Sequence, residues 1–230
     1  MIPKIYLLHL RYSHVDLHIH SKYSDGKSSI EEIAKKAKER GLKVIAIVDH
    51  SSEHPLGLNE KKAKLRELEI KNAEEKYSIR ILDGVECGIL EDGKIQKPNH
   101  DFDLIIASVH SYLPVKEFYK RVIKCIKTQE FHVLGHLHAE MFYAGRIEEL
   151  DTEIIDLLIE NGIALELNSQ HHAPPEDFLE LCVDKKLIYS IGSDAHHPER
   201  IGDVSWSKKM AKIYLRKGLT ILDEVHNFDG

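Results

Sequence analysis

Short apolar runs alternate with longer amphipathic segments along most of this chain. The apolar runs, rich in Val, Ile and Leu, predict seven β-strands, at 15–20, 43–50, 80–86, 104–110, 132–138, 162–168 and 187–196. Apolar residues spaced three and four apart predict helices between most of them, at 29–41, 60–77, 116–128, 151–161, 175–186 and 207–217. Because strands and helices alternate, we expect parallel strands joined by crossover helices and covered on both faces.

Every predicted strand finishes in residues that can bind a metal or support a metal ligand. The parallel strands of a barrel end at one mouth, where such folds carry their active sites. Side chains two apart on a strand point to the same side, so His18 with His20, and Asp194 with His196, each offer two groups to one cavity. The pattern predicts a metal site built from the strand ends, which are His18, His20, Asp49, His50, Glu86, His110, His136, His138, Asn168, Asp194 and His196.

The types of ligand narrow the choice of metal. Imidazole and carboxylate without thiolate suit Zn, Mn or Fe, and argue against Ca, which takes oxygen ligands. About nine groups are too many for one tetrahedral ion, but they can serve two or three ions that share bridging carboxylates, as in enzymes that act on phosphorus. Three divalent ions opposite Asp25, Glu86 and Asp194 would leave a local positive charge that attracts phosphate.

Composition limits the other classes of function. The chain has 230 residues, a net charge of −6 and a sequence pI of about 6.2, so it lacks the basic field of a non-specific binder of nucleic acid or anionic membrane. Cys87, Cys125 and Cys182 lie far apart without CxxC spacing and are predicted to be buried thiols of a reducing compartment. Because neither a membrane span nor a secretory signal is recognisable, we expect a cytoplasmic protein.

No linker, repeat or low-complexity tract divides the chain, so residues 1–230 are predicted to form a single domain. Residues 1–14 precede the first motif and are expected to be a leader or an additional strand. The sequence predicts no particular oligomeric state.

Taken together, the strand-end motifs resemble the PHP (polymerase and histidinol phosphatase) superfamily. The chain carries, in the order of that family and from about Val15 onward, HIHSKYSDG, IVDHS, GVECGI, ASVHS, GH, LELNS and GSDAH. The greatest similarity to the PHP domain of family X DNA polymerases lies in SDGKSSIEEIAKKAKERG, RILDGVECGILEDG and ALELNS. No polymerase domain is recognisable, so a stand-alone PHP domain is expected.

The resemblance implies a distorted (β/α)7 TIM-like barrel of parallel strands, with a trinuclear metal centre at its C-terminal mouth. His18 and His20 would bind one ion, Asp25 would reach a second, and Glu86 would bridge. The three divalent ions would be Zn, Mn or Fe, alone or mixed. The implied ligands are His18, His20, Asp25, His50, Glu86, His110, His136, Asp194 and His196.

Three strand-end residues stand outside this ligand set. Asp49 alternates away from His50 and is expected to orient a neighbour. Asn168, on the same strand face as Glu166, is expected to support ligands and not to bind metal. His138 is a departure from the family, which often has a proline after the residue corresponding to His136, and it is either an additional ligand, a proton donor or an ordinary residue of the rim.

The implied activity is hydrolysis of a phosphoester through a metal-bridged hydroxide. Arg146, Arg200 and Lys22 lie in loops beside the motifs and are candidate substrate contacts, because arginine in particular can bind two phosphate oxygens at once. The leaving oxygen would be protonated by metal-bound water or by a histidine of the mouth. The predicted catalytic residues are His138, His196 and Asp194.

The choice of substrate stays open at the level of sequence. A small phosphomonoester, similar to histidinol phosphate or a nucleotide, fits the acidic charge of the chain, which has no basic track for single strands. Similarity to the polymerase-associated domain instead favours a stand-alone 3′–5′ exonuclease on single-stranded nucleic acid. A non-catalytic metal-binding module is a third possibility, which the intact ligand set disfavours.

Overall fold

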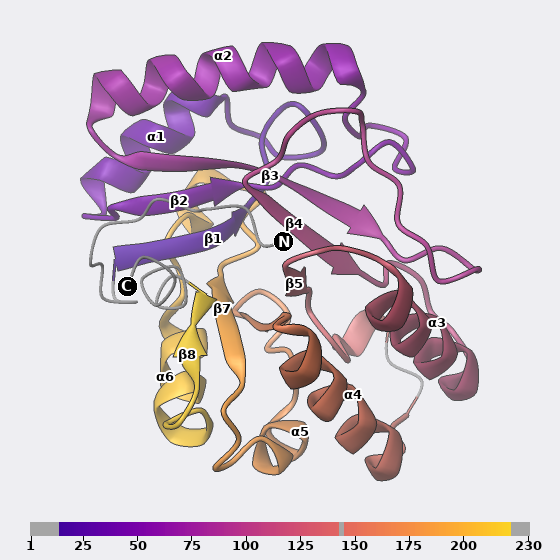
Figure 1. The fold of residues 1–230 in the computed structure, drawn as a ribbon. Coiled ribbons are helices and arrows are strands. Elements are labelled where there is room, and N and C mark those ends of the chain that lie inside the picture. Colours follow the sequence, from indigo (N-terminus) through magenta and orange to yellow (C-terminus); the bar gives the residue numbers. More distant parts are fainter. Residues whose placement is uncertain (1–13, 143–144, 222–230) are drawn as a thin grey trace, which may run out of the picture.

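The computed structural model describes residues 14–142 and 145–221, which form one curled sheet with helices on its outer side (Figure 1). Residues 1–13 of the predicted leader lie outside the described part. Eight parallel strands pair in the order of the sequence: β1 (Val15–Ile19), β2 (Val44–Ile47), β3 (Arg80–Gly88), β4 (Leu104–Ser108), β5 (Val133–Leu134), β6 (Ala164–Asn168), β7 (Ile188–Gly192) and β8 (Leu219–Thr220). The helices are α1 (Ile30–Glu39), α2 (Glu60–Tyr77), α3 (Val115–Thr128), α4 (Glu148–Asn161), α5 (Glu176–Leu181) and α6 (Ser205–Tyr214), with short 3-10 turns η2 (Glu140–Phe142) and η3 (Pro198–Arg200).

The sheet closes where β1 meets the segment that follows β7. Ile19 and Ala195 form a parallel bridge, and the backbone N–H of His20 donates to the carbonyl of Ala195 at 2.9 Å. Closure at this end brings the C-terminal ends of the first seven strands around one mouth, which confirms the predicted seven-stranded barrel. The eighth strand was not predicted. It is only two residues long, and it pairs with the beginning of β7 through Ile188 and Leu219.

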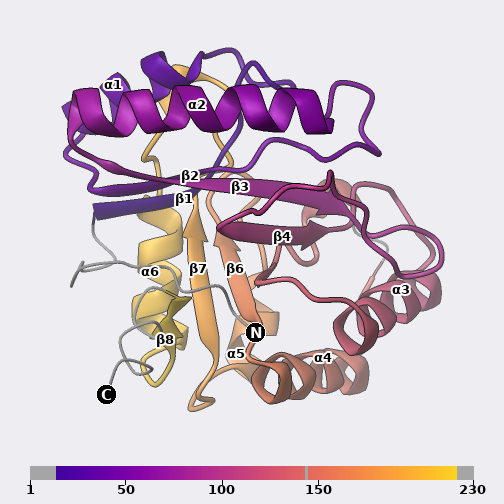
Figure 2. The same ribbon diagram turned by 45° about the horizontal axis from the view of Figure 1, so that its top comes forward.

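Alternation along the strands separates an inner core from two outer ones. One buried cluster takes its members from the strands, among them Leu17, Val44 and Leu104, and from Val48 and Ile221, which directly follow β2 and β8, and it fills the barrel interior. A second cluster packs the other face of β1–β3 against α1 and α2, and a third packs β3–β7 against α3–α6. Figure 2 shows α1 and α2 lying over β1–β3, with α3 to α6 around the remaining strands.

A register shift in β1 determines the direction in which His18 and His20 point. Leu17 belongs to the inner cluster, whereas Ile19 packs outside against α1, although side chains two positions apart on a regular strand share a face. The shift between Asp16 and Ile19 in the pairing with β2 accounts for this change, because an extra residue in one strand reverses the alternation beyond it. It leaves His18 and His20 facing the mouth of the barrel.

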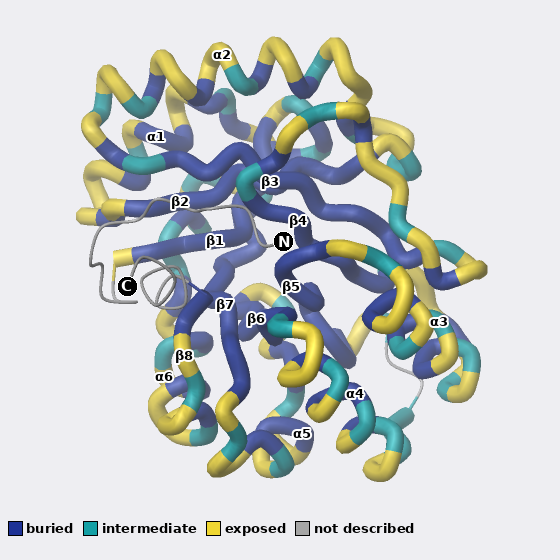
Figure 3. Tube along the Cα trace, viewed as in Figure 1, coloured by how far each residue is buried: buried dark blue, intermediate teal, exposed yellow. Residues whose placement is uncertain are grey.

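Burial follows the same layers, with the strands buried and the outer faces of the helices exposed (Figure 3). Cys87, Cys125 and Cys182 are buried free thiols, as predicted. Within residues 14–142 and 145–221, no helix combines the length and the apolar character needed to span a bilayer.

Candidate metal centre

The structure brings together all nine side chains that the sequence predicts as ligands. Each lies within 3.7 Å of at least one other member, at the C-terminal mouth of the barrel. We call this set the metal centre; its members are His18, His20, Asp25, His50, Glu86, His110, His136, Asp194 and His196.

Glu86 lies at the middle of the metal centre. It is almost fully buried near the end of β3, where alternation turns it inward and Cys87 outward. Its two carboxylate oxygens lie 3.1–3.7 Å from the ring nitrogens of five histidines, which are His18, His20, His50, His110 and His136. A carboxylate that faces rings from several strands would be available as a ligand to a cation that those rings hold.

Two aspartates complete the negative charge of the metal centre from either side of Glu86. Asp194 Oδ1 lies 3.4–3.6 Å from ring nitrogens of His18, His20 and His196. Asp25 lies 3.4–3.6 Å from ring nitrogens of His20, His50 and His196, and it belongs to a loop rather than to a strand. Three carboxylates are therefore spread across one continuous cluster of imidazoles.

Residues behind the ligands hold them in place. Glu166 accepts a hydrogen bond from His18 Nδ1 at 2.6 Å and another from the backbone N–H of His136 at 2.7 Å. Asn168 Nδ2 donates to Asp194 and to Glu166, both at 3.1 Å. Such partners fix the tautomer and orientation of ligands. The expectation that Asn168 and Glu166 support the ligands therefore agrees with the geometry.

Gly192 leaves the space that the His18–Glu166 hydrogen bond occupies. A methyl group at Gly192 would lie 2.5 Å from the Cβ of His18 and 2.7 Å from a carboxylate oxygen of Glu166. A side chain at this inward position of β7 would displace His18 or Glu166, so the glycine is favoured by close approach and not by a positive φ.

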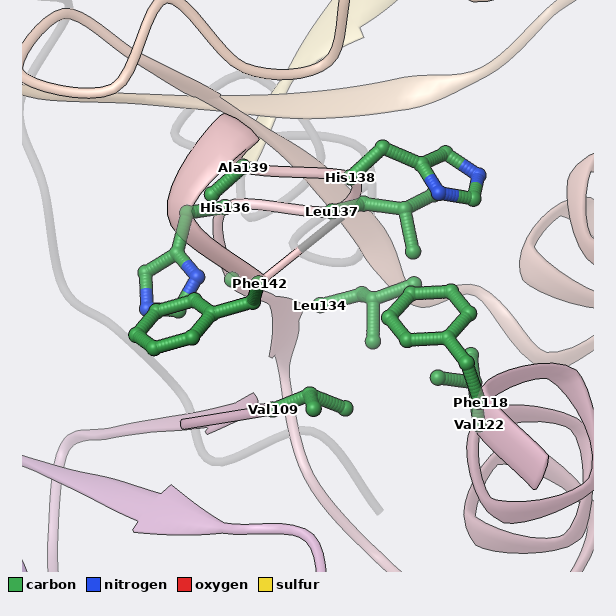
Figure 4. A pocket seen from close by; sticks show the side chains of 10 residues that line it. Val109, Phe118, Val122, Leu134, His136, Leu137, His138, Ala139 and Phe142 are labelled. Carbon is green, nitrogen blue, oxygen red and sulfur yellow. The ribbon is translucent and has the colours of Figure 1, made fainter. Parts of the chain in front are cut away.

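His136 and His138 diverge, although the sequence pattern predicts that they share a side. Strand β5 ends at Leu134, and His136 and His138 have positive φ angles of 21° and 59°. Figure 4 shows the two rings projecting in opposite directions from the segment that lines a cavity of about 10 Å³. A non-glycine residue with positive φ is uncommon and leaves the extended path, so the two-residue alternation of a strand does not apply here.

The donor atoms of the metal centre fit divalent cations. Three buried ring nitrogens have no hydrogen-bond partner, although each faces a carboxylate at 3.1–3.6 Å: His20 Nδ1, His50 Nδ1 and His110 Nε2. Buried polar atoms normally have partners, so these lone pairs are explained by ions that the nitrogens would bind. Nitrogen and carboxylate donors without thiolate suit Zn, Mn or Fe, as the sequence predicts.

The charges of the metal centre support the same interpretation. Burial raises the pKa of Glu86, but His110 and His18 outweigh burial and hold this pKa well below its usual value. Burial acts in the same way on Asp194, and His18 again holds the pKa well below its usual value. Burial lowers the pKa of His50, yet the adjoining carboxylates raise it to about 10. Without metal, the carboxylates stay ionised and raise the pKa of several neighbouring rings, as expected of a site that requires positive charge, whereas burial lowers the pKa of His20 to about 4.

A second buried cluster takes two of the predicted site residues away from the metal centre. His138 Nε2 lies 2.8 Å from Asp151 Oδ1, Tyr119 donates to the same oxygen at 2.7 Å, and Arg146 Nε donates to Oδ2 at 2.7 Å. We call these four residues the Asp151 cluster. Arg146 also pairs with Asp177 of α5. Both groups are turned toward Asp151, whereas the catalytic role predicted for His138 and the substrate contact predicted for Arg146 stay predictions.

The other two candidate substrate contacts lie on the surface and are paired. Lys22 Nζ is 3.5 Å from Glu32, and Arg200 Nη1 is 2.9 Å from Asp203. Both residues belong to segments that follow ligand motifs, and their contact with a substrate stays a prediction.

Two histidines outside the ligand set also adjoin the metal centre. His171 Nε2 lies 3.3 Å from Asp194, and its ring centroid is 5.3 Å from that of His136. His54 stacks on His50 with ring centroids 4.4 Å apart. Neither residue is among the ligands that the sequence predicts, and the position of His54 depends on how the loop after β2 folds back.

Comparison with known proteins agrees with this geometry. The profile of the PHP domain matches residues 16–170, more than half of the chain. Over 224 residues the chain is 30% identical to the DNA polymerase/3′-5′ exonuclease PolX of Bacillus subtilis; the match covers 92% of this chain and 38% of that protein. The chain thus spans about two fifths of this relative. It is 27% identical to a probable phosphatase of Caldicellulosiruptor bescii, covering 87% of each.

Solved structures share the fold. The crystal structure of histidinol phosphate phosphatase from Lactococcus lactis, in complex with Zn, L-histidinol and phosphate, matches with a TM-score of 0.67 and 20% identity over 90% of this chain and 95% of that one. Family profile, motif order and fold agree, and the chain belongs to the PHP domain family.

Proposed function

We propose that this chain is a metal-dependent phosphatase that hydrolyses a small phosphomonoester. The observation that supports the proposal is the metal centre itself, six histidines and three carboxylates gathered around Glu86 at the mouth of the barrel. Divalent ions bound by such groups polarise phosphoryl oxygens and activate water for attack on phosphorus. The named activity of the probable phosphatase relatives, which this chain matches over most of their length, is consistent with it.

Three divalent ions are the number we propose. Ligand atoms gather within 4.8 Å of one another in three overlapping groups, which are His18, His20 and Glu86; His50, Glu86 and His110; and His20, Asp25, His50 and His196. Because Glu86 belongs to two of the groups and His20 and His50 join the third to them, the ions would share one substrate. Glu166 and Asn168 keep the ligands in place from behind.

The substrate would enter on the side where the ligands are partly exposed. Asp25, His110 and His196 expose 28–33% of their side chains, whereas those of His18 and Glu86 are at most 1% exposed. His196, which lies on this open side, is our candidate for protonating the leaving oxygen. His171 is 21% exposed beside Asp194 and is placed to donate to a phosphoryl oxygen.

The charges beside the mouth favour a single phosphate group over a polyanion. Lys22 and Arg200, the two predicted cations that lie there, are each neutralised by an acidic neighbour, and the chain carries a net charge of −6. Proteins that track nucleic acid present a positive groove with exposed aromatic side chains. Exonuclease action is the second candidate, favoured by the 30% identity to PolX of Bacillus subtilis.

A side-by-side assay tests the proposal. Protein loaded with Mn or Zn is given histidinol phosphate, a nucleoside monophosphate, or a single-stranded oligonucleotide labelled at its 5′ end, and bound metal is measured on the same batch. Release of inorganic phosphate from a monoester, lost in Glu86→Gln, is the expected result. A ladder of shortened oligonucleotides without phosphate release would favour the exonuclease, and bound metal without any turnover would favour the non-catalytic module.

A further inference from the structure

Arg66 of α2 is a fully buried arginine behind the metal centre. Its side chain is 0% exposed, on a helix whose other charges are mostly at the surface. Nη1 donates to Asp49 at 2.8 Å, while Nη2 donates to Asp83 and to the carbonyl of Gly84, both at 2.5 Å. One guanidinium therefore ties together the outward-facing aspartates of β3 and of the segment after β2. A buried charge of this kind is tolerated only when it is paired and hydrogen-bonded.

Asp49 connects Arg66 to the loop that carries the predicted ligand Asp25. Its Oδ2 accepts from the hydroxyl of Ser21 at 2.7 Å as well as from Arg66. Its Oδ1 accepts from the backbone N–H of Ser21 at 2.8 Å and from the hydroxyl of Ser24 at 2.7 Å. Ser21 directly follows His20, and Ser24 directly precedes Asp25. The carboxylate of Asp49 thus holds both ends of the short loop between two ligands.

Helix α2 touches the same loop at two more points. Lys62 Nζ donates to the carbonyl of Tyr23 at 3.0 Å, and the hydroxyl of Tyr23 donates to Glu69 at 2.8 Å. Lys62 also donates to the carbonyls of Leu56 and Gly57, in the loop that follows His50. Two loops that adjoin the metal centre are therefore attached to one helix, although no residue of α2 is itself a ligand.

Asp25 depends on this attachment more than the other carboxylates do. Glu86 lies within β3, and Asp194 follows β7 and is bonded by Asn168. Asp25 has no strand backbone to place it and is the carboxylate of the four-ligand group with His20, His50 and His196. We infer that Asp49, which Arg66 holds, is a positioning residue that sets the affinity of this one metal position through Ser21 and Ser24, without governing the other positions.

The inference rests on the proposed metal centre but not on the proposed reaction, and its test is a metal titration. Zn or Mn bound per chain is measured at fixed free-metal concentrations for the wild type, Asp49→Asn and Ser24→Ala. Loss of a ligand's supporting partner typically weakens metal binding 10–100-fold, so Asp49→Asn should weaken one ion about tenfold or more and Ser24→Ala should weaken the same ion less. The remaining ions should bind as in the wild type.

Asp83→Asn is the matched control. It breaks the other buried pair of Arg66, and so should lower thermal stability comparably, but Asp83 has no hydrogen bond to the loop of Ser21 and Ser24 among those that the structure shows. Asp83→Asn should bind all ions as the wild type does. Equal metal loss in Asp49→Asn and Asp83→Asn, or no loss in Asp49→Asn, would overturn the inference. Phosphate release is measured in parallel, so a wild type that binds metal without turnover would contradict only the proposed function.

Discussion

The metal centre and the Asp151 cluster are both built from buried histidine and carboxylate, yet they differ in how their charge is balanced. His136 contributes to the first and His138, two residues later, to the second. In the Asp151 cluster one carboxylate meets an arginine, a tyrosine hydroxyl and a histidine at 2.7–2.8 Å. In the metal centre three carboxylates face six imidazoles, three buried ring nitrogens have no hydrogen-bond partner, and no lysine or arginine is among the ligands.

This difference separates a structural cluster from a functional one. Asp151 is satisfied by groups of the chain itself, and its partners pack α3 and α4 against the segment after β5. The metal centre keeps its carboxylates ionised but supplies no permanent cation, so its balance must come from outside the chain. A histidine close to a carboxylate is therefore informative only once the other partners of that carboxylate are known.

The largest effect is expected from Glu86→Gln. The substitution preserves size but removes the charge that five histidines share, so bound metal should fall and phosphate release should drop by about a thousandfold, equivalent to about 4 kcal/mol of lost Lewis-acid stabilisation. Metal analysis and a phosphate-release assay measure the two quantities, with circular dichroism to verify folding. Full metal content and turnover in this variant would break the assignment of the metal centre.

Asp151→Asn is expected to lower stability without changing the metal content. It leaves Arg146 and His138 without their buried charged partner, which should lower the free energy of unfolding by about 3 kcal/mol. Metal content per folded chain should be unchanged, because Asp151 has no contact with the ligand carboxylates. Denaturant unfolding measures the predicted loss of stability, and metal analysis measures the metal content. A stable variant that had lost metal would contradict the distinction between the two clusters.

Removing metal should make stability depend on pH. In the metal-free chain the carboxylates raise the pKa of His50 to about 10, so the proton is held more tightly in the folded state. This stabilisation is complete below about pH 6.5 and is lost as the pH rises toward 10, which amounts to about 2.5 kcal/mol between pH 7 and pH 9. Thermal unfolding in chelator should show this decline, and protein loaded with Zn or Mn should not.

The smallest effect is expected from Gly192→Ala. The added methyl would press on Glu166 and His18 and misorient a ligand, lowering metal affinity about tenfold. Ser190→Ala, two residues earlier on β7, is the matched control, because the hydroxyl of Ser190 is buried without a hydrogen-bond partner. Metal titration of the two variants is the measurement. Equal affinities would show that the His18–Glu166 contact tolerates displacement.

Much of the fold and of the metal centre could be predicted from local patterns. Strand alternation indicates which residues face inward, and it correctly turned Asp49 away from His50 and placed Glu86 inside. Parallel strands that close on each other bring their C-terminal ends together, so ligand-type residues at those ends had to meet. Strand β8, which is two residues long, was not predicted.

By itself, the sequence determined the alternating elements, the common mouth and the types of residue gathered there, because these depend on short-range periodicity and on the geometry of a parallel sheet. Only the tertiary structure decided the direction of His138 and Arg146, because positive φ angles end the strand's alternation and Asp151, on α4, attracts both groups. The tertiary structure also decided the burial of Arg66. Within a lysine-rich helix nothing marks one cation as buried, since its partners Asp49 and Asp83 come from neighbouring segments of the sheet that fold against it.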